Sequence, residues 1–544
     1  MRHPLPTIKN SKLRITYIYS KKGPTLTLNS NYLVSNVEEQ KSERNSNTGE
    51  KSMLSSPALT ALKSATEALI SEYKAANPKS EEAFNNAKAS GVAGGTNRAS
   101  IFYTPFPLTF VDASEATAIT ADGQHLTDFL GNYTAGLFGF SPTPVKEAVA
   151  KAMETGHALG GASNLLEAKV AKEFTTRFPS IDLVRFSNTG TEANSYAIHT
   201  ARAVTRKNKI MMYDGAYHGA WIHGGKMAGP LDTPYEKVIV PYGDIDLIVR
   251  AIRDNADDLA AFIMEPVTVN PIVYLKQVAP TQYLSAIREA CTEAGCALIF
   301  DEVMTSRLAP GGAQELAQVT PDMTTFGKYF GGGFPFGGFG GTTKWMERHD
   351  PLHPETINSG GTFNQNALCL TAVDAVLEHL WTPEQCLAHN AKGDWFREEI
   401  NRLAKSLGAP CQACGTGSLI TLIWQKRPVI QGRDGDINSD RLGLAPQRAV
   451  FEASQLFWFH MLQKHDILAG SPKLNYLTLP TVLTDKDYNK FLAALGEFFN
   501  THKEELALLA TETAEGLEQT QEEKDISAMV STSYTHEHEL RTAN

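Results

Sequence analysis

The strongest constraint on the fold of this chain is an alternation of short apolar runs with helical stretches between about residues 160 and 345. Apolar side chains recur at helical spacing over 191–205 and 281–294. Interleaved with these stretches are short apolar runs at 209–213, 238–240, 261–264 and 297–300. Short apolar runs separated by helices are typical of a mostly parallel sheet with helices on both faces. The pattern therefore predicts an α/β fold.

The length of 544 residues predicts two or more domains, at roughly 100–200 residues per domain. Apolar residues at helical spacing from Pro57 to Asn77 predict a helix ahead of the first short strands. Five segments follow from the patterns: a disordered leader, an N-terminal helix with part of a small domain, a large domain, a C-terminal small domain and a disordered tail. Their expected bounds are 1–52, 53–155, 156–375, 376–508 and 509–544.

Composition argues against several classes of function. The net charge of −10 gives no attraction to nucleic acid or to an anionic membrane, and no apolar stretch is long enough to span a bilayer. The six cysteines suggest no disulfide framework, and Cys411 and Cys414 form a lone C-x-x-C without further zinc ligands at suitable spacing. The histidines do not cluster along the chain as metal ligands, so no metal is expected.

The first 37 residues carry basic side chains and no acidic one, as mitochondrial presequences do. Pro4, Pro6 and Pro24 would break a long amphipathic helix there. This favours a disordered leader, or a true start at Met53. We therefore expect a cytoplasmic protein, with a mitochondrial location as the alternative.

A segment suited to binding phosphate runs from Arg185 to Asn194, where a strand ends, small residues turn the chain and a helix begins. A helix N-terminus presents unpaired N–H groups and the positive end of its dipole. Gly190 allows a close approach of the backbone, and the hydroxyl of Thr191 adds a donor. The alternative is an ordinary helix capped by threonine.

Two further segments hold side chains suited to a flat, charged ligand. Tyr217, followed by His218 and a glycine, offers an aromatic face, although an exposed turn is the alternative. Asp301 follows the apolar run 297–300 directly, so its carboxylate is costly unless it is paired. The carboxyl end of a parallel strand opens into the crevice where α/β proteins bind ligands.

A lysine stands in a glycine- and aromatic-rich loop at 324–341. Apolar surroundings lower the pKa of a lysine by desolvation, as a nucleophilic amine requires, so Lys328 is a candidate catalytic residue. A solvated lysine in a flexible loop is the alternative, and it fits poorly with so many phenylalanines. A second turn of small residues, 359–364, contains Thr362 and precedes a helical run, again suited to phosphate.

In this order, and with Glu265-Pro266 between them, these segments resemble the class III aminotransferases of pyridoxal-phosphate fold type I over roughly residues 95–505. The resemblance is greatest to the branch of glutamate-1-semialdehyde aminomutase and aromatic β-amino-acid transaminases. It implies a large domain with a mostly parallel, seven-stranded-type sheet, and a smaller α+β domain formed by both chain ends. It also implies pyridoxal 5'-phosphate (PLP) as the cofactor.

The resemblance assigns roles around the cofactor ring. Lys328 would form the Schiff base and move the proton. Asp301 would bind the pyridinium nitrogen, which makes the ring an electron sink. Val303 would pack on one face of the ring and Tyr217 would stack on the other.

The resemblance also assigns the phosphate site. Gly190 and Thr191 would hold the phosphate, with Glu192 shaping the site beside them. Thr362 would hold the phosphate from a neighbouring subunit, so the active unit would be a homodimer.

The substrates implied are an amino acid and a keto acid, both small molecules. Arg98 lies in a segment that resembles the one where this branch carries a carboxylate-binding arginine, and the planar guanidinium suits a carboxylate. The segments 102–108 and 301–310 favour a transaminase for a β- or aromatic amino acid. Lys473 stands where the transaminases tend to carry arginine, and Asn270 resembles the aminomutases. An intramolecular aminomutase is therefore the alternative.

Overall fold

The computed structural model describes residues 19–20, 23–24, 56–158, 161–225, 228–267, 278–426, 444–472 and 476–514. Most of the expected leader, the chain after residue 514, and Asn270 and Lys473 lie outside the described residues. Strands β1 (Tyr19–Ser20) and β2 (Gly23–Pro24) pair antiparallel in the leading part of the chain. The other described elements belong to one compact unit that begins at Ser56.

A seven-stranded sheet forms the centre of the large domain, in the order β6-β12-β11-β10-β9-β7-β8. Strands β11, β10, β9, β7 and β8 are parallel, whereas β12 runs antiparallel to both of its neighbours. Apolar residues fill the central strands, since both faces of the sheet are covered. The bounds are β6 (Leu183–Ser187), β7 (Lys209–Tyr213), β8 (Lys237–Val240), β9 (Leu259–Met264), β10 (Ala297–Asp301), β11 (Met323–Gly327) and β12 (Gly337–Gly341).

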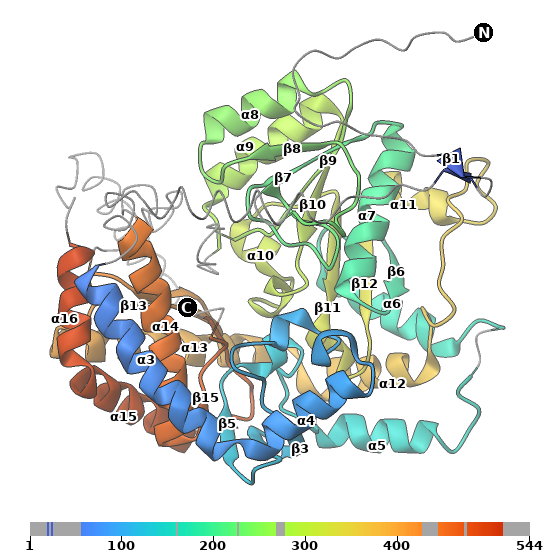
Figure 1. Cartoon of the computed structure of the whole chain (residues 1–544). Coiled ribbons are helices and arrows are strands. Elements are labelled where there is room, and N and C mark those ends of the chain that lie inside the picture. The colour runs from blue at the N-terminus through green and yellow to red at the C-terminus, as the bar shows by residue number, and fades with distance from the viewer. Residues whose placement is uncertain are drawn as a thin grey trace, which may run out of the picture. The chain divides into compact units, whose positions relative to one another are not determined.

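The helices between these strands pack on the sheet, as the alternating pattern predicted. Helix α7 contacts β9, β11 and β12, and helix α9 contacts β9 and β10 (Figure 1). The α/β fold is therefore confirmed. The helices of this part are α5 (Thr143–Ala152), α6 (Leu165–Arg177), α7 (Gly190–Thr205), α8 (Ile245–Asp254), α9 (Thr281–Ala294), α10 (Ala313–Ala317), α11 (Thr343–Met346) and α12 (Ala367–Ala375).

Both ends of the described unit meet in a second body. The blue helix α3 lies against the orange helix α14 in Figure 1, and the two share one apolar core with α13, α15 and α16. Two small sheets complete it, with orders β13-β14-β16 and β15-β5-β4-β3. The helices are α3 (Pro57–Ala76), α4 (Pro78–Ala89), α13 (Pro383–Leu407), α14 (Leu444–His465), α15 (Asp485–Thr501) and α16 (Lys503–Glu512). The strands are β3 (Phe110–Ser114), β4 (Thr117–Thr120), β5 (His125–Asp128), β13 (Cys411–Thr416), β14 (Leu419–Trp424), β15 (Ile467–Leu468) and β16 (Tyr476–Thr478).

The segment 324–341 differs from the loop that its glycines suggested, because it contains most of β11 and all of β12. Glycines occur in β12 where neighbouring side chains leave no room. A Cβ on Gly338 would lie 2.4 Å from the ring of Phe326. The phenylalanines of this segment pack in an apolar cluster with α6, in which the rings of Phe174 and Phe326 stack at 4.1 Å. Most of the segment is therefore part of the packed core.

None of the described helices is both long enough and apolar enough to cross a lipid bilayer.

Candidate active site

The motifs predicted from the sequence meet at one edge of the large sheet. Asp301 ends β10 and pairs in register with Thr325 of β11, two residues before that strand ends at Gly327. Gly327 in turn pairs with Gly337 of β12, and Gly337 with Ser187 at the end of β6. The carboxylate, the lysine that follows β11 and the turn that follows β6 therefore emerge along the same edge. Ligands of α/β sheets bind at such edges.

Asp301 is 5% exposed and sits in a network of donors. His218 Nδ1 and Asn194 Nδ2 both lie 2.8 Å from its Oδ2, and the Val303 N–H donates to Oδ1 at 3.1 Å. Thr325 holds the amide of Asn194 through a 2.6 Å hydrogen bond. An ionised carboxylate only accepts, so His218 carries its proton on Nδ1.

The hydrogen-bond network around Asp301 keeps its carboxyl group ionised. Burial by itself would raise the pKa of its carboxyl group, but the hydrogen bond and charge of His218, the Val303 N–H and the charge of Lys328 outweigh burial and hold the pKa below its ordinary value. The group therefore stays ionised at neutral pH. A buried, ionised acid at a strand end suits a cationic ring nitrogen.

The turn after β6 has the features of a phosphate site. Thr189 caps α7 by accepting a hydrogen bond from the Glu192 N–H at 3.1 Å. A Cβ on Gly190 would lie 2.8 Å from Val303 Cγ1, so the helix start and Val303 are in direct contact. The Thr191 hydroxyl accepts from the Ala220 N–H at 3.2 Å, which joins this turn to the loop of Tyr217. The capped helix and the phosphate site are thus compatible interpretations.

Tyr217 is 51% exposed, and its ring lies 5.3 Å from that of His223. Burial of the rest of the side chain raises the pKa of its phenol, the Asp301 charge raises it further, and the Arg98 charge lowers it. The charges of both Asp301 and Arg98 therefore act on this phenol. Because the side chain is only half-buried, one face of its ring is free to stack on a flat ligand.

Lys328 follows β11 with a left-handed backbone, φ 54°, which is uncommon outside glycine. Its neighbours Tyr329 and Phe330 are fully buried, and Lys328 itself is half-buried. Such strain persists only where surrounding packing imposes it, and it concentrates at functional sites. The solvated, flexible lysine considered above does not fit this setting.

Arg98 is exposed and is held by a turn that the sequence patterns did not reveal. It donates to Asn132 Oδ1 at 3.1 Å, and its guanidinium lies 5.7 Å from the ring centre of Tyr133. Asn132, Tyr133 and Thr134 are three successive non-glycine residues with positive φ, at 45°, 56° and 76°. The Thr134 N–H donates to the hydroxyl of Thr478 in β16 at 3.2 Å, which anchors this strained turn. The sequence gives only a weak signal for this turn, because of its three residues only Asn132 readily adopts a positive φ.

Thr362 is exposed, as is the adjacent Phe363 at 67%. Their loop is tied to the phosphate turn, because Asn188 donates to Asn364 Oδ1 at 2.9 Å. Arg185 of β6 also donates to the Ser359 carbonyl at 3.1 Å. The structure thus places Thr362 on an exposed loop beside the site rather than within the Asp301 network.

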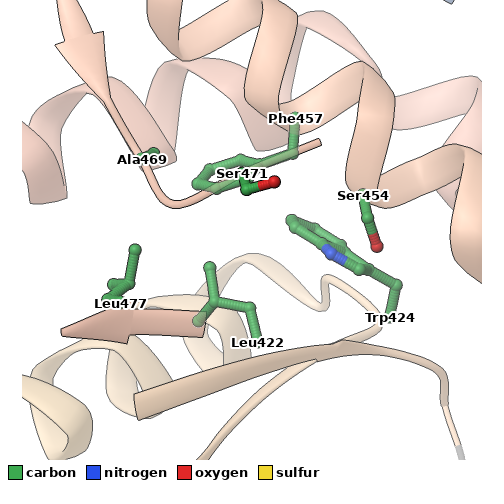
Figure 2. A pocket seen from close by; sticks show the side chains of 7 residues that line it. All are labelled: Leu422, Trp424, Ser454, Phe457, Ala469, Ser471 and Leu477. Carbon is green, nitrogen blue, oxygen red and sulfur yellow. The ribbon is translucent and has the colours of Figure 1, made fainter. Parts of the chain in front are cut away.

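The residues present fit PLP. The buried carboxylate suits the ring nitrogen, the half-open tyrosine and Val303 suit the ring, the start of α7 suits the phosphate, and a lysine follows the neighbouring strand. A separate cavity in the second body has room for roughly one water molecule (Figure 2). Its walls are apolar apart from Trp424, Ser454 and Ser471, so it is not the cofactor site.

Comparison with known proteins shows the family of this chain. The family model for class III aminotransferases matches residues 102–431. The β-phenylalanine transaminase of Variovorax paradoxus is 36% identical, over 78% of this chain and 94% of the relative. A crystal structure of the β-phenylalanine aminotransferase from the same species has a TM-score of 0.74 at 35% identity, and covers 81% of this chain and 98% of that one.

A glutamate-1-semialdehyde 2,1-aminomutase of Opitutus terrae is 37% identical over a shorter span, 59% of this chain and 78% of the relative. Both branches named from the sequence are therefore among the relatives. With the family match over more than half of the chain, the chain belongs to the class III aminotransferase family, and it is an aminotransferase that uses PLP as its cofactor.

Proposed function

We propose that this enzyme transfers the amino group of a β-amino acid with an aromatic side chain to a keto acid, with Lys328 as the catalytic residue. The observation that carries the proposal is the convergence of Lys328, the ionised Asp301 and the start of α7 at one sheet edge. The similarity to a β-phenylalanine transaminase over 94% of that relative supports the substrate class.

When bound, PLP supplies an aldehyde that takes up the amino group and a ring that withdraws electrons. Lys328 Nζ would hold the cofactor covalently and carry the proton between the substrate carbon and the cofactor. Asp301 would keep the ring nitrogen protonated, because its own carboxyl stays ionised. Val303 and Tyr217 would confine the ring from its two faces.

The phosphate would bind at Gly190 and Thr191, where the N-terminus of α7 offers unpaired N–H groups. We further propose that the partner subunit's Thr362 completes this site in a homodimer. Support comes from the exposure of Thr362 and of the adjacent Phe363, which is 67% exposed.

Arg98 would bind the substrate carboxylate. It lies close enough to the phenol of Tyr217 to lower that group's pKa, and Tyr217 also feels the Asp301 charge. This effect on Tyr217 supports a position of the guanidinium beside the same site. The exposed fork suits a carboxylate that arrives with the substrate.

The test is a half-reaction. The purified holoenzyme is mixed with 3-amino-3-phenylpropanoate, without keto acid, and the cofactor absorbance is followed. We expect conversion to pyridoxamine phosphate, reversed by 2-oxoglutarate or pyruvate. Lys328→Ala should abolish turnover without unfolding the protein, since alanine meets the same backbone restriction. Lys344→Ala, which replaces an exposed lysine, is the control and should keep normal turnover. Turnover retained in Lys328→Ala would refute the assignment of Lys328 as the catalytic residue.

The second candidate is an aminomutase, favoured by the 37% identity to a glutamate-1-semialdehyde 2,1-aminomutase. Such an enzyme would isomerise glutamate 1-semialdehyde without a keto acid. No conversion with the β-amino acid, together with isomerisation of the semialdehyde, would replace our proposal. We also propose the cytoplasm over the mitochondrion, because Pro4, Pro6 and Pro24 interrupt the basic leader. Cell fractionation distinguishes the two locations.

A further inference from the structure

A cluster of histidines lies in the second body, in elements that contribute none of the site residues above. His460 and His465 belong to α14, Glu497 to α15, and His502 follows α15. One ligand atom each from His460, His465 and Glu497 all lie within 4.8 Å of one another. His465 Nε2 is 3.7 Å from Glu497 Oε1. Ligands of a tetrahedral zinc ion stand about 3.3 Å apart, so small side-chain rotations would bring them to one ion.

The hydrogen bonds of the cluster leave ring nitrogens without partners. His460 is 2% exposed, and its Nδ1 lies 3.1 Å from His502 Nε2. Among the described residues, Nε2 of His460 and Nε2 of His465 are buried and have no hydrogen-bond partner. A buried polar nitrogen without a partner costs free energy, which a metal ion would recover.

We propose that His460, His465 and Glu497 bind a divalent transition-metal ion of the zinc class, as a clip between the C-terminal end of α14 and α15. Two imidazoles and a carboxylate are a ligand set that zinc accepts, with water in the fourth position. His460 would bind through Nε2, and its Nδ1–H would donate to His502. A hydrogen bond from the second ring nitrogen is the usual support of a metal-bound histidine.

Two lysines near the cluster are engaged elsewhere. Lys464 pairs with Glu72 at 2.6 Å, and Lys490 donates to Thr127 at 3.2 Å. The Glu497 side chain is 60% exposed, which gives an ion a path of entry. The Phe498 ring, 5.2 Å from that of His460, forms an apolar wall.

The test titrates the chelator-treated holoenzyme with Zn²⁺ in a calorimeter and with Co²⁺ in a spectrophotometer. We expect one site per chain and Co²⁺ bands without thiolate charge transfer, which separates this site from the buried cysteines. Glu497→Gln and His465→Ala should each weaken Zn²⁺ binding at least tenfold. Zn²⁺ should raise the melting temperature of the unaltered enzyme but not of Glu497→Gln.

Glu497 is largely exposed, so its replacement should leave the fold and the transaminase turnover intact. Glu504→Gln, an exposed acid on α16 outside the cluster, is the matched control and should bind Zn²⁺ normally. Absence of stoichiometric binding would overturn the proposal, and the four side chains would then be a hydrogen-bonded, water-filled cluster. Binding that survives both Glu497→Gln and His465→Ala would also overturn it. Neither outcome depends on the substrate of the enzyme.

Discussion

Replacement of His218 by phenylalanine should change the protonation of Asp301. The imidazole is 2% exposed, its Nε2 has no partner among the described residues, and its Nδ1 contacts Asp301 at 2.8 Å. Phenylalanine keeps an aromatic ring at this position but removes both the hydrogen bond and the charge of the imidazole. A hydrogen bond to a charged group contributes about 1.5–3 kcal/mol. At about 1.4 kcal/mol per pKa unit, the pKa of Asp301 should rise by about 1–2 units.

The sign of the pH effect follows from the depressed pKa in the folded protein. The stability that the ionised Asp301 contributes is present above its unfolded pKa and is lost as the pH falls through the folded value. In His218→Phe the folded pKa is higher. Acid unfolding should therefore begin at a higher pH, and the acidic limb of kcat/KM for the half-reaction should move upward by the same amount.

The assay measures kcat/KM and cofactor retention between acid and neutral pH for both proteins. His199→Phe, which replaces an exposed histidine on α7, is the control and should leave the profile unchanged. Coincident acidic limbs and equal cofactor retention in His218→Phe and the unaltered enzyme would refute the role given to His218.

Arg98→Ala should raise KM for the carboxylate donor by about 10–100-fold, because it removes a charged contact of about 1.5–3 kcal/mol. KM for 1-phenylethylamine, an amine donor without a carboxylate, should stay unchanged. Equal effects on the two KM values would exclude carboxylate recognition by Arg98. Asn132→Ala removes the side-chain oxygen that accepts a 3.1 Å hydrogen bond from Arg98, and it should raise KM for the carboxylate donor by less than Arg98→Ala does. An unchanged KM in steady-state kinetics would contradict this prediction. Gly190→Ala places a Cβ 2.8 Å from Val303 and should weaken PLP binding by about 1–3 kcal/mol, as measured by equilibrium titration. Gly161→Ala is the control and should bind PLP normally, because its Cβ meets nothing within 4 Å.

Local patterns were enough to predict the elements around the site. Apolar spacing predicted α9 at Thr281–Ala294 and the core of β10, because helices and strands repeat within a few residues. The same local reading failed for the glycines of β12. Whether a glycine marks a loop or a crowded strand depends on neighbours such as Phe326, which belongs to another strand.

The sequence by itself predicted the α/β class and the candidates Lys328 and Asp301, because each follows from residue types at short spacing. It predicted the family through the resemblance of its ordered segments to class III aminotransferases. Only the tertiary structure decided their environment. The contact of His218 with Asp301 joins residues 83 apart, and the one between Arg98 and Asn132 joins residues 34 apart. Side chains that are distant along the chain meet only when packing brings their elements together. The same physical reason hides the cluster of His460, Glu497 and their neighbours from any pattern along the chain.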